Sequence, residues 1–435
     1  MFVFGGFRFD PNARSLSVRG VGVPLRPRTA ALLEYFVRNP GRTLGKAELF
    51  DGLWPNEDVT EGNLSQHVFT LRTALARHDP HAAFVVTEPG RGYRFVARVT
   101  RADRRTDIGS AAYRLYLRGR CSYEKRTAGA LRRSIGWFRR ALAEDASYAP
   151  AYAGLASAYV LSGEYLLLAP RAAFGRAREA AQRALALDPG SSEAHAALGE
   201  IACYHDRDFA RAGVHYREAV ELAPQAAGPA VLRAWFLNLA GRAHEARDLL
   251  ATVLAREPCS AGVQTSLAVC AIFRRRFGEA AELLRAVLDV DRDDVHARYY
   301  LAMALQLDGR YAEALSLTGG ALPDGYEQQL LALRGYLLAR LDRRDEARAC
   351  ETALRALASR GRFVSSYNTA LLALGHGDLD GALVRVRAGL AARDPWSVFV
   401  FEHPQFDELR RDSRFPALAQ STALRRFEDA ARAVR

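Results

Sequence analysis

The side chains between residues 61 and 77 show the clearest chemical pattern in the sequence. Four apolar residues recur there at helical spacing: Leu64, Val68, Leu71 and Leu75. This spacing predicts a helix that buries one side and leaves the other free. Amide, hydroxyl and guanidinium groups on the free side have the chemistry to bind base edges and phosphates in the major groove of duplex DNA. The predicted DNA contacts on this helix are Asn63, Ser65, Gln66, His67, Phe69, Thr70, Arg72, Thr73 and Arg77.

Two further basic residues lie in a predicted hairpin that follows the helix. Phe84–Thr87 and Tyr93–Val99 have the composition of strands and enclose a glycine-rich tip at residues 88–92. Arg91 lies at this tip and Arg94 on the outgoing strand. Both are therefore predicted to reach the adjacent minor groove or the phosphate backbone.

Residues 1–100 supply the elements that would hold this helix and hairpin in place. Short apolar runs separated by glycine and Asp-Pro-Asn turns predict a small antiparallel sheet over residues 2–25. A first helix follows and ends at Asn39-Pro40-Gly41, and a second runs from about Gly45 to Leu53. A sheet, three helices and a terminal hairpin, in that order, form a winged helix-turn-helix.

Charge favours an anionic partner for this segment. The whole chain has a formal net charge of +12. Residues 1–105 contain 16 Arg and Lys against 10 Asp and Glu, a net charge of +6 in about a quarter of the length. Bulk charge does not by itself distinguish nucleic acid from an acidic protein, but its position beside the predicted helix favours DNA.

Residues 1–98 resemble the OmpR-type winged-helix family, and in particular the subgroup of CadC, ToxR and HilA-like regulators. The matching stretches are Leu25–Pro40, Glu48–Pro55, Val59–Leu75 and Val86–Phe95. The resemblance implies that residues 63–77 form the recognition helix and that Arg91 belongs to the DNA-contacting wing. It also implies a loop facing RNA polymerase, with Trp54, Asn56, Glu57 and Asp58 as its candidate residues.

The sequence departs from the family pattern in two respects. Many members have basic residues where Phe69 and Thr70 stand here, which puts phosphate or guanine contacts from these positions in question. Many members also have a receiver domain before the winged helix or a membrane span after it, and we expect neither here. The overall plan is most similar to winged-helix regulators without a membrane span that carry helical repeats.

From residue 111 onward the sequence is helical and periodic. Small residues recur at spacings of 33–35 in two series, Gly199, Ala234, Ala268, Ala302, Gly335, Ala370 and Ala212, Ala246, Ala280, Ala314, Ala347, Ala382. A small side chain on each helix of a pair lets the two backbones approach closely. A period near 34 with paired small residues is typical of tetratricopeptide repeats, which stack into an α-solenoid.

The predicted fold is therefore mainly α, with an α+β winged helix followed by a repeat solenoid. The expected domains are residues 1–100, a polar linker at 101–110, about eight helix pairs over 111–395, and a C-terminal cap at 396–435 whose aromatic residues cover the last repeat. A ligand groove of such an array is lined by the first helix of each pair. The candidate groove residues are Trp235, Asn238, Tyr299, Gln306, Tyr336 and Tyr367, which either bind a peptide or small ligand or pack between repeats.

Catalytic and metal chemistry have little support in the sequence. The five cysteines show no C-x-x-C spacing, which favours free thiols in a reducing compartment. No H-x-x-x-H or H-E-x-x-H motif occurs, so His195, His205, His215 and His296 are expected on repeat surfaces. We expect no enzyme activity, cofactor, metal, signal peptide or membrane span, and a cytoplasmic location.

Together these features predict a sequence-specific regulator of transcription, with activation favoured over repression. The predicted partners are double-stranded DNA, RNA polymerase, and a protein or small molecule in the repeat groove, with self-association into a homo-oligomer left open. An alternative is a tetratricopeptide scaffold whose winged helix has become a protein-binding module. The neutral residues Phe69 and Thr70 favour that alternative.

Overall fold

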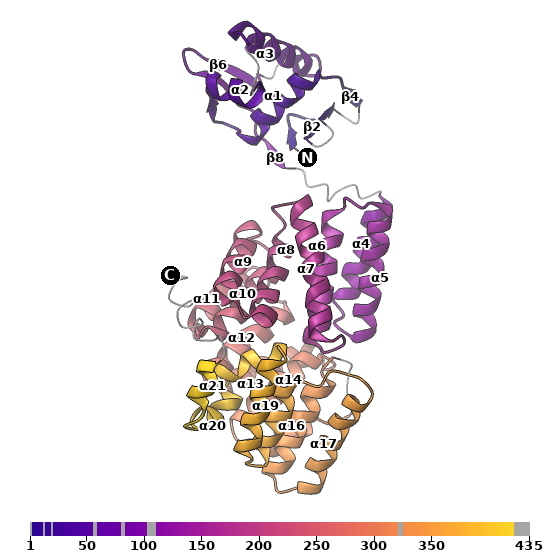
Figure 1. Cartoon of the computed structure of the whole chain (residues 1–435), viewed down its shortest axis with the longest axis vertical. Coiled ribbons are helices and arrows are strands. Elements are labelled where there is room, and N and C mark those ends of the chain that lie inside the picture. Colours follow the sequence, from indigo (N-terminus) through magenta and orange to yellow (C-terminus); the bar gives the residue numbers. More distant parts are fainter. Residues whose placement is uncertain are drawn as a thin grey trace. The chain divides into compact units, whose positions relative to one another are not determined.

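The computed structural model of the protein describes residues 2–11, 14–18, 21–54, 59–79, 83–101, 110–320 and 325–421. The chain divides into two compact units, Met1–Tyr113 and Arg114–Arg435. Figure 1 shows that the first contains both strands and helices, whereas the second is built from helices. The structure is therefore mainly α, with a small α+β unit at its N-terminal end, as the sequence predicts.

The N-terminal unit combines two antiparallel sheets with three helices. Its elements are, in order, β1 (Phe2–Phe4), β2 (Phe7–Asp10), β3 (Ser15–Val18), β4 (Val21–Val23), α1 (Pro27–Arg38), β5 (Thr43–Leu44), α2 (Lys46–Leu53), α3 (Glu61–Ala76), β6 (Val85–Glu88), β7 (Gly92–Phe95) and β8 (Thr100–Arg101). One sheet has the order β4-β3-β2-β1-β8 and the other the order β5-β7-β6. The strands β5 and β8 were not predicted, and β8 extends into the segment that the sequence marked as a linker.

Alternating phenylalanines fix the first sheet on the core. Phe2 pairs with Phe9 and Phe4 with Phe7 in the β1–β2 register. All four rings are buried, because residues two apart in a strand point to the same side. Phe95 on β7 stacks on Phe36 of α1, with ring centroids 6.0 Å apart. The sheets and helices thus share one hydrophobic core, on which α3 also lies.

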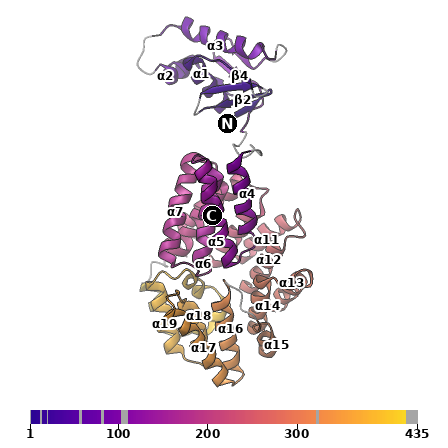
Figure 2. The ribbon, with the colours of Figure 1, turned by 90° about the vertical axis from the view of Figure 1, so that its right-hand side faces the viewer.

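The second unit consists of consecutive helix pairs, which Figure 2 shows side by side along a curved array. The pairs are α4 (Ala111–Tyr123) and α5 (Ala128–Glu144), α6 (Ala149–Glu164) and α7 (Pro170–Leu187), α8 (Ser192–Glu200) and α9 (Phe209–Leu222), α10 (Ala227–Leu239) and α11 (Ala243–Leu254), α12 (Ala261–Phe273) and α13 (Phe277–Val290), α14 (Val295–Leu307) and α15 (Tyr311–Ser316), α16 (Glu327–Arg340) and α17 (Arg344–Ser359), and α18 (Ser366–Gly375) and α19 (Leu379–Ala391). A π-helix, η2 (Ile201–Asp206), continues α8. This architecture is the predicted tetratricopeptide-like solenoid.

The small residues of the 34-residue period lie where the two helices of each pair meet. Ala234, Ala268 and Ala302 are completely buried. A Cβ atom added at Gly199 would come within 2.9 Å of the Tyr216 ring. A Cβ atom at Gly335 on α16 would come within 3.2 Å of the Cβ atom of Cys350 on α17. The period therefore reflects close backbone approach, which only the smallest side chains permit.

The turns between paired helices repeat as regularly as the helices themselves. One residue in each turn has a left-handed backbone, and these residues are Arg126, Leu166, Arg207, Gly241, Arg275, Gly309, Asp342 and Gly377, with φ between 49° and 77°. Glycine adopts this conformation without strain, whereas arginine and aspartate do so at a cost. The same turn geometry is thus imposed on different residues by the packing of the repeats.

The chain beyond the last pair turns back over the repeats. It contains two 3₁₀ helices, η3 (Pro395–Phe401) and η4 (Pro404–Phe406), followed by α20 (Asp407–Arg410) and α21 (Phe415–Ser421). Val398, Phe399, Val400, Phe406 and Leu409 are buried and belong to the hydrophobic core of the solenoid. We call residues 395–410 the return segment.

Within the described part of the chain, every helix is too short or too polar to cross a lipid bilayer.

Candidate nucleic-acid interface

Helix α3 has the two faces that the sequence predicts. Leu64, Val68, Leu71 and Leu75 are buried. Of the predicted DNA contacts, Asn63, Ser65, Gln66, Phe69 and Arg77 are exposed, and His67, Thr70, Arg72 and Thr73 are half-buried. The exposed side combines amide, hydroxyl and guanidinium groups with one large ring, Phe69, which is 63% exposed. This face has the hydrogen-bonding groups needed to read base edges.

Two of the hydroxyl groups on this face already have partners. Thr70 Oγ1 donates a hydrogen bond to the backbone carbonyl of Gln66, at 2.8 Å, so its oxygen lone pairs remain available as acceptors. Ser65 Oγ lies 3.3 Å from the hydroxyl of Tyr93 on β7. Ser65 therefore links the start of α3 to the hairpin while it remains exposed on the helix surface.

Arg72 fastens α3 to the wing. Its Nε donates to the carbonyl oxygen of Val85 at 3.0 Å, and its Nη2 donates to Thr87 Oγ1 at 2.9 Å. Both acceptors belong to β6. These contacts fix the angle between the helix and the hairpin, so Arg72 has a positioning role, and its phosphate contact stays a prediction.

His67 faces inward rather than outward. Its Nδ1 lies 3.0 Å from Thr29 Oγ1, and its ring centroid lies 5.6 Å from that of Trp54. Burial, followed by the nearby charges of Arg26 and Arg28, lowers the pKa of His67. A neutral imidazole in this position joins α3 to α1 and contributes no positive charge to the interface.

Trp54 is also part of the core, with only 7% of its surface exposed. Its ring lies 5.9 Å from that of Phe50, and the guanidinium of Arg28 lies 5.9 Å from its centroid. Trp54 thus anchors the end of α2 from within. The other predicted polymerase-facing residues, Asn56, Glu57 and Asp58, lie outside the described residues.

The hairpin presents one exposed cation at its tip. Arg91 is exposed, and its backbone N–H closes the turn by donating to Glu88 O at 2.9 Å. Arg94 forms an ion pair of 2.7 Å with Glu88, so the charge of Arg94 is already compensated. The adjacent Gly92 has φ of 134°, and a Cβ atom there would overlap the carbonyl oxygen of Leu44. The tip geometry therefore depends on glycine.

Arg26 is a basic residue near this surface that the sequence analysis missed. It is exposed at the N-cap of α1, and its charge acts on His67 of α3. A phosphate beside the first turn of α1 would interact favourably with this guanidinium and with the helix N-terminus. The available signal was the Arg26-Pro27-Arg28 run at the start of a helix.

The predicted groove residues of the repeat unit are mostly covered. Trp235 is half-buried, and the other five, Asn238, Tyr299, Gln306, Tyr336 and Tyr367, are buried with at most 8% exposed. Part of this cover is the return segment. The hydroxyl of Tyr367 donates to Gln405 Oε1 at 2.8 Å, and the ring of Trp235 lies 6.3 Å from that of Phe399. Of the two readings left open by the sequence, packing within the protein describes these residues.

Polar contacts join the return segment to several repeats. Trp396 Nε1 donates to the carbonyl oxygen of Glu164 at 2.8 Å. Arg275 forms an ion pair of 2.7 Å with Asp407, and Arg340 forms one of 2.6 Å with Glu408. The C-terminal cap expected over the last repeat thus also contacts repeats that lie far earlier in the chain.

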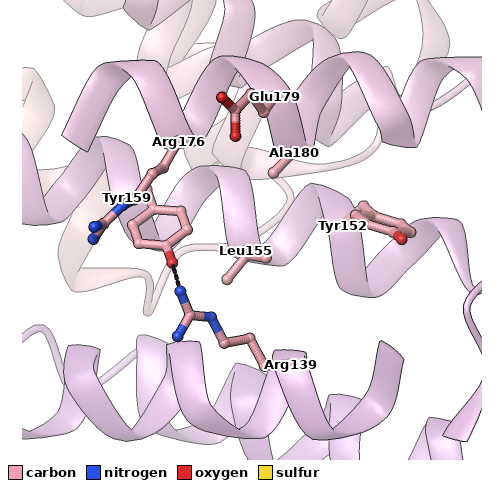
Figure 3. Close-up of a pocket in the computed structure, with 7 residues that line it drawn as sticks. All are labelled: Arg139, Tyr152, Leu155, Tyr159, Arg176, Glu179 and Ala180. Carbon is pink, nitrogen blue, oxygen red and sulfur yellow. Dashed lines mark hydrogen bonds between the residues drawn. The ribbon is translucent and has the colours of Figure 1, made fainter. Parts of the chain in front are cut away.

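A cleft of about 330 Å³ lies among α5, α6 and α7. Figure 3 shows the guanidinium of Arg139 pointing to the hydroxyl of Tyr159, which accepts its hydrogen bond at 2.6 Å. Arg176 lies on the other side of the same ring, 5.9 Å from its centroid. None of the residues predicted for the groove lines this cleft.

Comparison with known proteins supports the assignment of the N-terminal unit. Residues 20–95 match the family model described as "Transcriptional regulatory protein, C terminal". The "Transcriptional activator CadC" of Escherichia coli (strain K12) is 30% identical over 96 residues, which are 22% of this chain and 19% of that protein. The solved DNA-binding domain of E. coli CadC is 29% identical, with a TM-score of 0.22, and the match covers 23% of this chain and 94% of that chain.

For the repeats, a tetratricopeptide repeat protein from Parabacteroides merdae is 13% identical, with a TM-score of 0.41, and the match covers 61% of this chain and 98% of that chain. This chain spans between about a fifth and about a half of the length of the curated relatives that it matches. Residues 20–95 thus form an OmpR-type winged-helix domain, in a chain whose second unit is a helical-repeat solenoid over its described residues.

Proposed function

We propose that the protein is a sequence-specific transcription regulator that binds double-stranded DNA through α3 and the β6–β7 hairpin. The observation that carries the proposal is the exposed polar face of α3, held on a rigid core by four buried residues and by Arg72. In this proposal Asn63, Gln66 and Arg77 contact the duplex from the major groove. Arg91 contacts the phosphate backbone or the minor groove from the wing.

The proposed direction of regulation is activation. It is supported by the name of the relative CadC, a transcriptional activator. The family resemblance further suggests that Asn56, Glu57 and Asp58 contact RNA polymerase next to the promoter. Such a regulator acts where the chromosome lies, so the proposal includes a cytoplasmic location, and it requires binding rather than catalysis.

The proposed role of the repeat unit is to bind a protein partner or peptide. Helical-repeat solenoids present extended surfaces for such ligands. Here the return segment already contacts two of the predicted groove residues, Tyr367 and Trp235. A partner in the groove therefore has to displace residues 395–410, whereas a homo-oligomer formed through the outer helices would leave them in place.

The DNA-binding proposal is tested by selecting duplexes from a random pool with the full chain and then measuring affinities by fluorescence anisotropy. A selected duplex should bind at least about 1000-fold more tightly than a scrambled one at physiological salt. Gln66→Ala should cost about 1–3 kcal/mol on the selected duplex and almost nothing on the scrambled one. Binding that is steeply salt-dependent but blind to sequence would contradict the proposal.

One observation favours the second candidate function, a winged helix that binds protein. Phe69 is 63% exposed in the middle of the proposed DNA-binding face, and large exposed rings are common anchors of protein interfaces. Under this alternative, Phe69→Ala abolishes partner binding and Arg91→Ala has no effect. Under the DNA-binding proposal, Arg91→Ala lowers affinity for every duplex.

A further inference from the structure

Three potential metal-ligand side chains meet between the two helices of one repeat. His195 lies on α8, and His215 and Glu218 lie on α9. The His195 Nδ1 atom is 3.2 Å from His215 Nδ1 and 2.8 Å from Glu218 Oε2, and His215 Nδ1 is 3.9 Å from the same oxygen. One atom of each side chain thus points toward a common centre.

The helices hold these side chains in place. Ser192 Oγ, one turn before His195, donates to the carbonyl oxygen of Ala219 at 2.7 Å. Ala219 directly follows Glu218, so this buried hydrogen bond fixes the start of α8 against the end of α9. The side chains of His195 and His215 are only 14% and 15% exposed, whereas that of Glu218 is 46% exposed. The arrangement is therefore rigid on the side of the imidazoles and open to solvent at the carboxylate.

Without a metal ion, a single proton can hold the three side chains of this cluster together. A neutral imidazole carries one proton, on either Nδ1 or Nε2. A proton on His195 Nδ1 can be shared between Glu218 Oε2 at 2.8 Å and His215 Nδ1 at 3.2 Å, whereas His215 Nδ1 is too far from that oxygen, at 3.9 Å, to donate to it. In this arrangement the lone pair of His215 Nδ1 points toward the centre of the cluster.

The distances agree with a small divalent ion. Bonds of about 2.0–2.1 Å from Zn²⁺ to nitrogen or oxygen place the corners of a tetrahedron about 3.3 Å apart. The observed separations of 2.8, 3.2 and 3.9 Å lie on both sides of that value. Two imidazoles and one carboxylate suit zinc and its neighbours, whereas Mg²⁺ and Ca²⁺ favour oxygen ligands alone.

We propose that His195, His215 and Glu218 form a binding site for a divalent transition-metal ion of the Zn²⁺ class, with water in the fourth position beside the exposed Glu218. The ion would cross-link α8 to α9. It would thereby stiffen the repeat that also contains Arg207, whose Nη1 donates to the carbonyl oxygen of Leu390 at 2.6 Å.

The test uses the full chain with Cys121 and Cys259 replaced by serine, because both thiols are exposed and could bind zinc themselves. After removal of metal with a chelator, the protein is titrated with Co²⁺, and the visible absorption bands of a tetrahedral cobalt centre are recorded. Zn²⁺ is then added in competition. We expect one ion per chain, displacement of Co²⁺ by Zn²⁺, and a higher Tm with Zn²⁺ than with chelator.

The matched variants are His195→Ala and His215→Ala, with His244→Ala as the control on the neighbouring repeat, where His244 is exposed on α11. Loss of one metal-binding side chain should raise the Kd for the ion at least about 100-fold. This is the upper end of the effects seen for residues that only orient such a side chain. Glu218→Gln, at the exposed position, removes the anionic ligand with the least risk to folding.

The Tm of every variant is first compared in chelator, so that misfolding is recognised separately from lost binding. Two results would overturn the proposal. One is a full chain that takes up no Co²⁺ or Zn²⁺ at a ratio of one. The other is a set of folded ligand variants that bind the ions as tightly as His244→Ala does.

Discussion

The side-chain amide of Gln405 donates a hydrogen bond of 2.6 Å to Gln306 Oε1, across 99 positions of the sequence. Gln405 Oε1 in turn accepts from the hydroxyl of Tyr367. Both glutamines are buried, with 4% and 5% of their surface exposed. This amide pair therefore links the return segment to α14 and α18 at once, in a place where an unpaired polar group would be costly.

Gln405→Ala should destabilise the repeat unit by about 1–3 kcal/mol, because it leaves the amide of Gln306 and the hydroxyl of Tyr367 buried without this partner. Chemical denaturation followed by circular dichroism measures the change. Gln264→Ala is the matched control, since Gln264 bonds to Pro258 O on the surface, and it should stay within about 0.5 kcal/mol of the parent. Equal effects of the two substitutions would argue against a stabilising role of the amide pair.

Arg72 and Arg91 should separate into a structural and a DNA-binding effect. Arg72→Ala removes two hydrogen bonds to β6 and should destabilise the N-terminal unit by about 1–3 kcal/mol. Arg91→Ala should leave stability unchanged, lower affinity for all duplexes alike, and reduce the slope of log affinity against log salt by about 1. Thermal denaturation and salt-dependent anisotropy distinguish them, and an unchanged slope for Arg91→Ala would exclude its phosphate contact.

Gly92→Ala should strongly destabilise the wing. The new Cβ atom would overlap the Leu44 carbonyl oxygen, and the φ of 134° is unfavourable for alanine. Hydrogen exchange measured by mass spectrometry should show faster exchange in β5, β6 and β7. The control is Gly62→Ala on α3, where the nearest atom lies at 3.6 Å and helix propensity favours alanine by up to about 1 kcal/mol.

Stability of the repeat unit should fall as the pH rises from about 5 to above 7. Burial raises the pKa of Glu164 to about 7, and burial together with the Glu164 carboxylate raises the pKa of Glu200. Between their unfolded and folded pKa values the folded protein holds more protons, so deprotonation destabilises it. Glu164→Gln should flatten this dependence of the Tm on pH and raise the Tm at pH 8.

Glu313 provides the control for the pH experiment. It is exposed, and hydrogen bonds from Arg285 and Arg310 lower its pKa. Glu313→Gln should therefore keep the slope of the parent protein above pH 5. A Glu164→Gln variant with that same slope would show that Glu164 is ionised in the folded protein at neutral pH.

The features that depend on local spacing were predictable from the sequence. The 3.6-residue period of apolar residues predicts the buried face of α3. The small residues that recur about every 34 positions predict the helix pairs, because only small side chains fit where the paired helices approach closely. The two-residue strands β5 and β8 were missed, because their existence depends on pairing with β7 and β1 rather than on their own composition. Local patterns therefore predicted the elements but not every pairing between them.

The features that depend on distant contacts could not be predicted. A break in the repeat period marked the start of the C-terminal segment, but nothing in it indicates that Trp396 reaches Glu164, 232 residues earlier. Trp54 was assigned to a loop surface, although its size and apolar ring favour the core where it lies. The meeting of His195 with His215 likewise requires the angle between two helices, which no spacing rule supplies.

At Arg207 and Arg275, the left-handed backbone costs free energy, whereas the side chain of the same residue makes a long-range contact. Glycine, which is present at the equivalent positions Gly241 and Gly309, would lower the backbone strain at Arg207 or Arg275 by about 1–2 kcal/mol. It would also remove the hydrogen bond from Arg207 to the carbonyl oxygen of Leu390 on α19 in one case, and the ion pair of Arg275 with Asp407 of the return segment in the other. A glycine at either turn would thus lower the local backbone strain and at the same time remove a long-range contact. The strained arginine turns are therefore the condition for these contacts between distant parts of the chain.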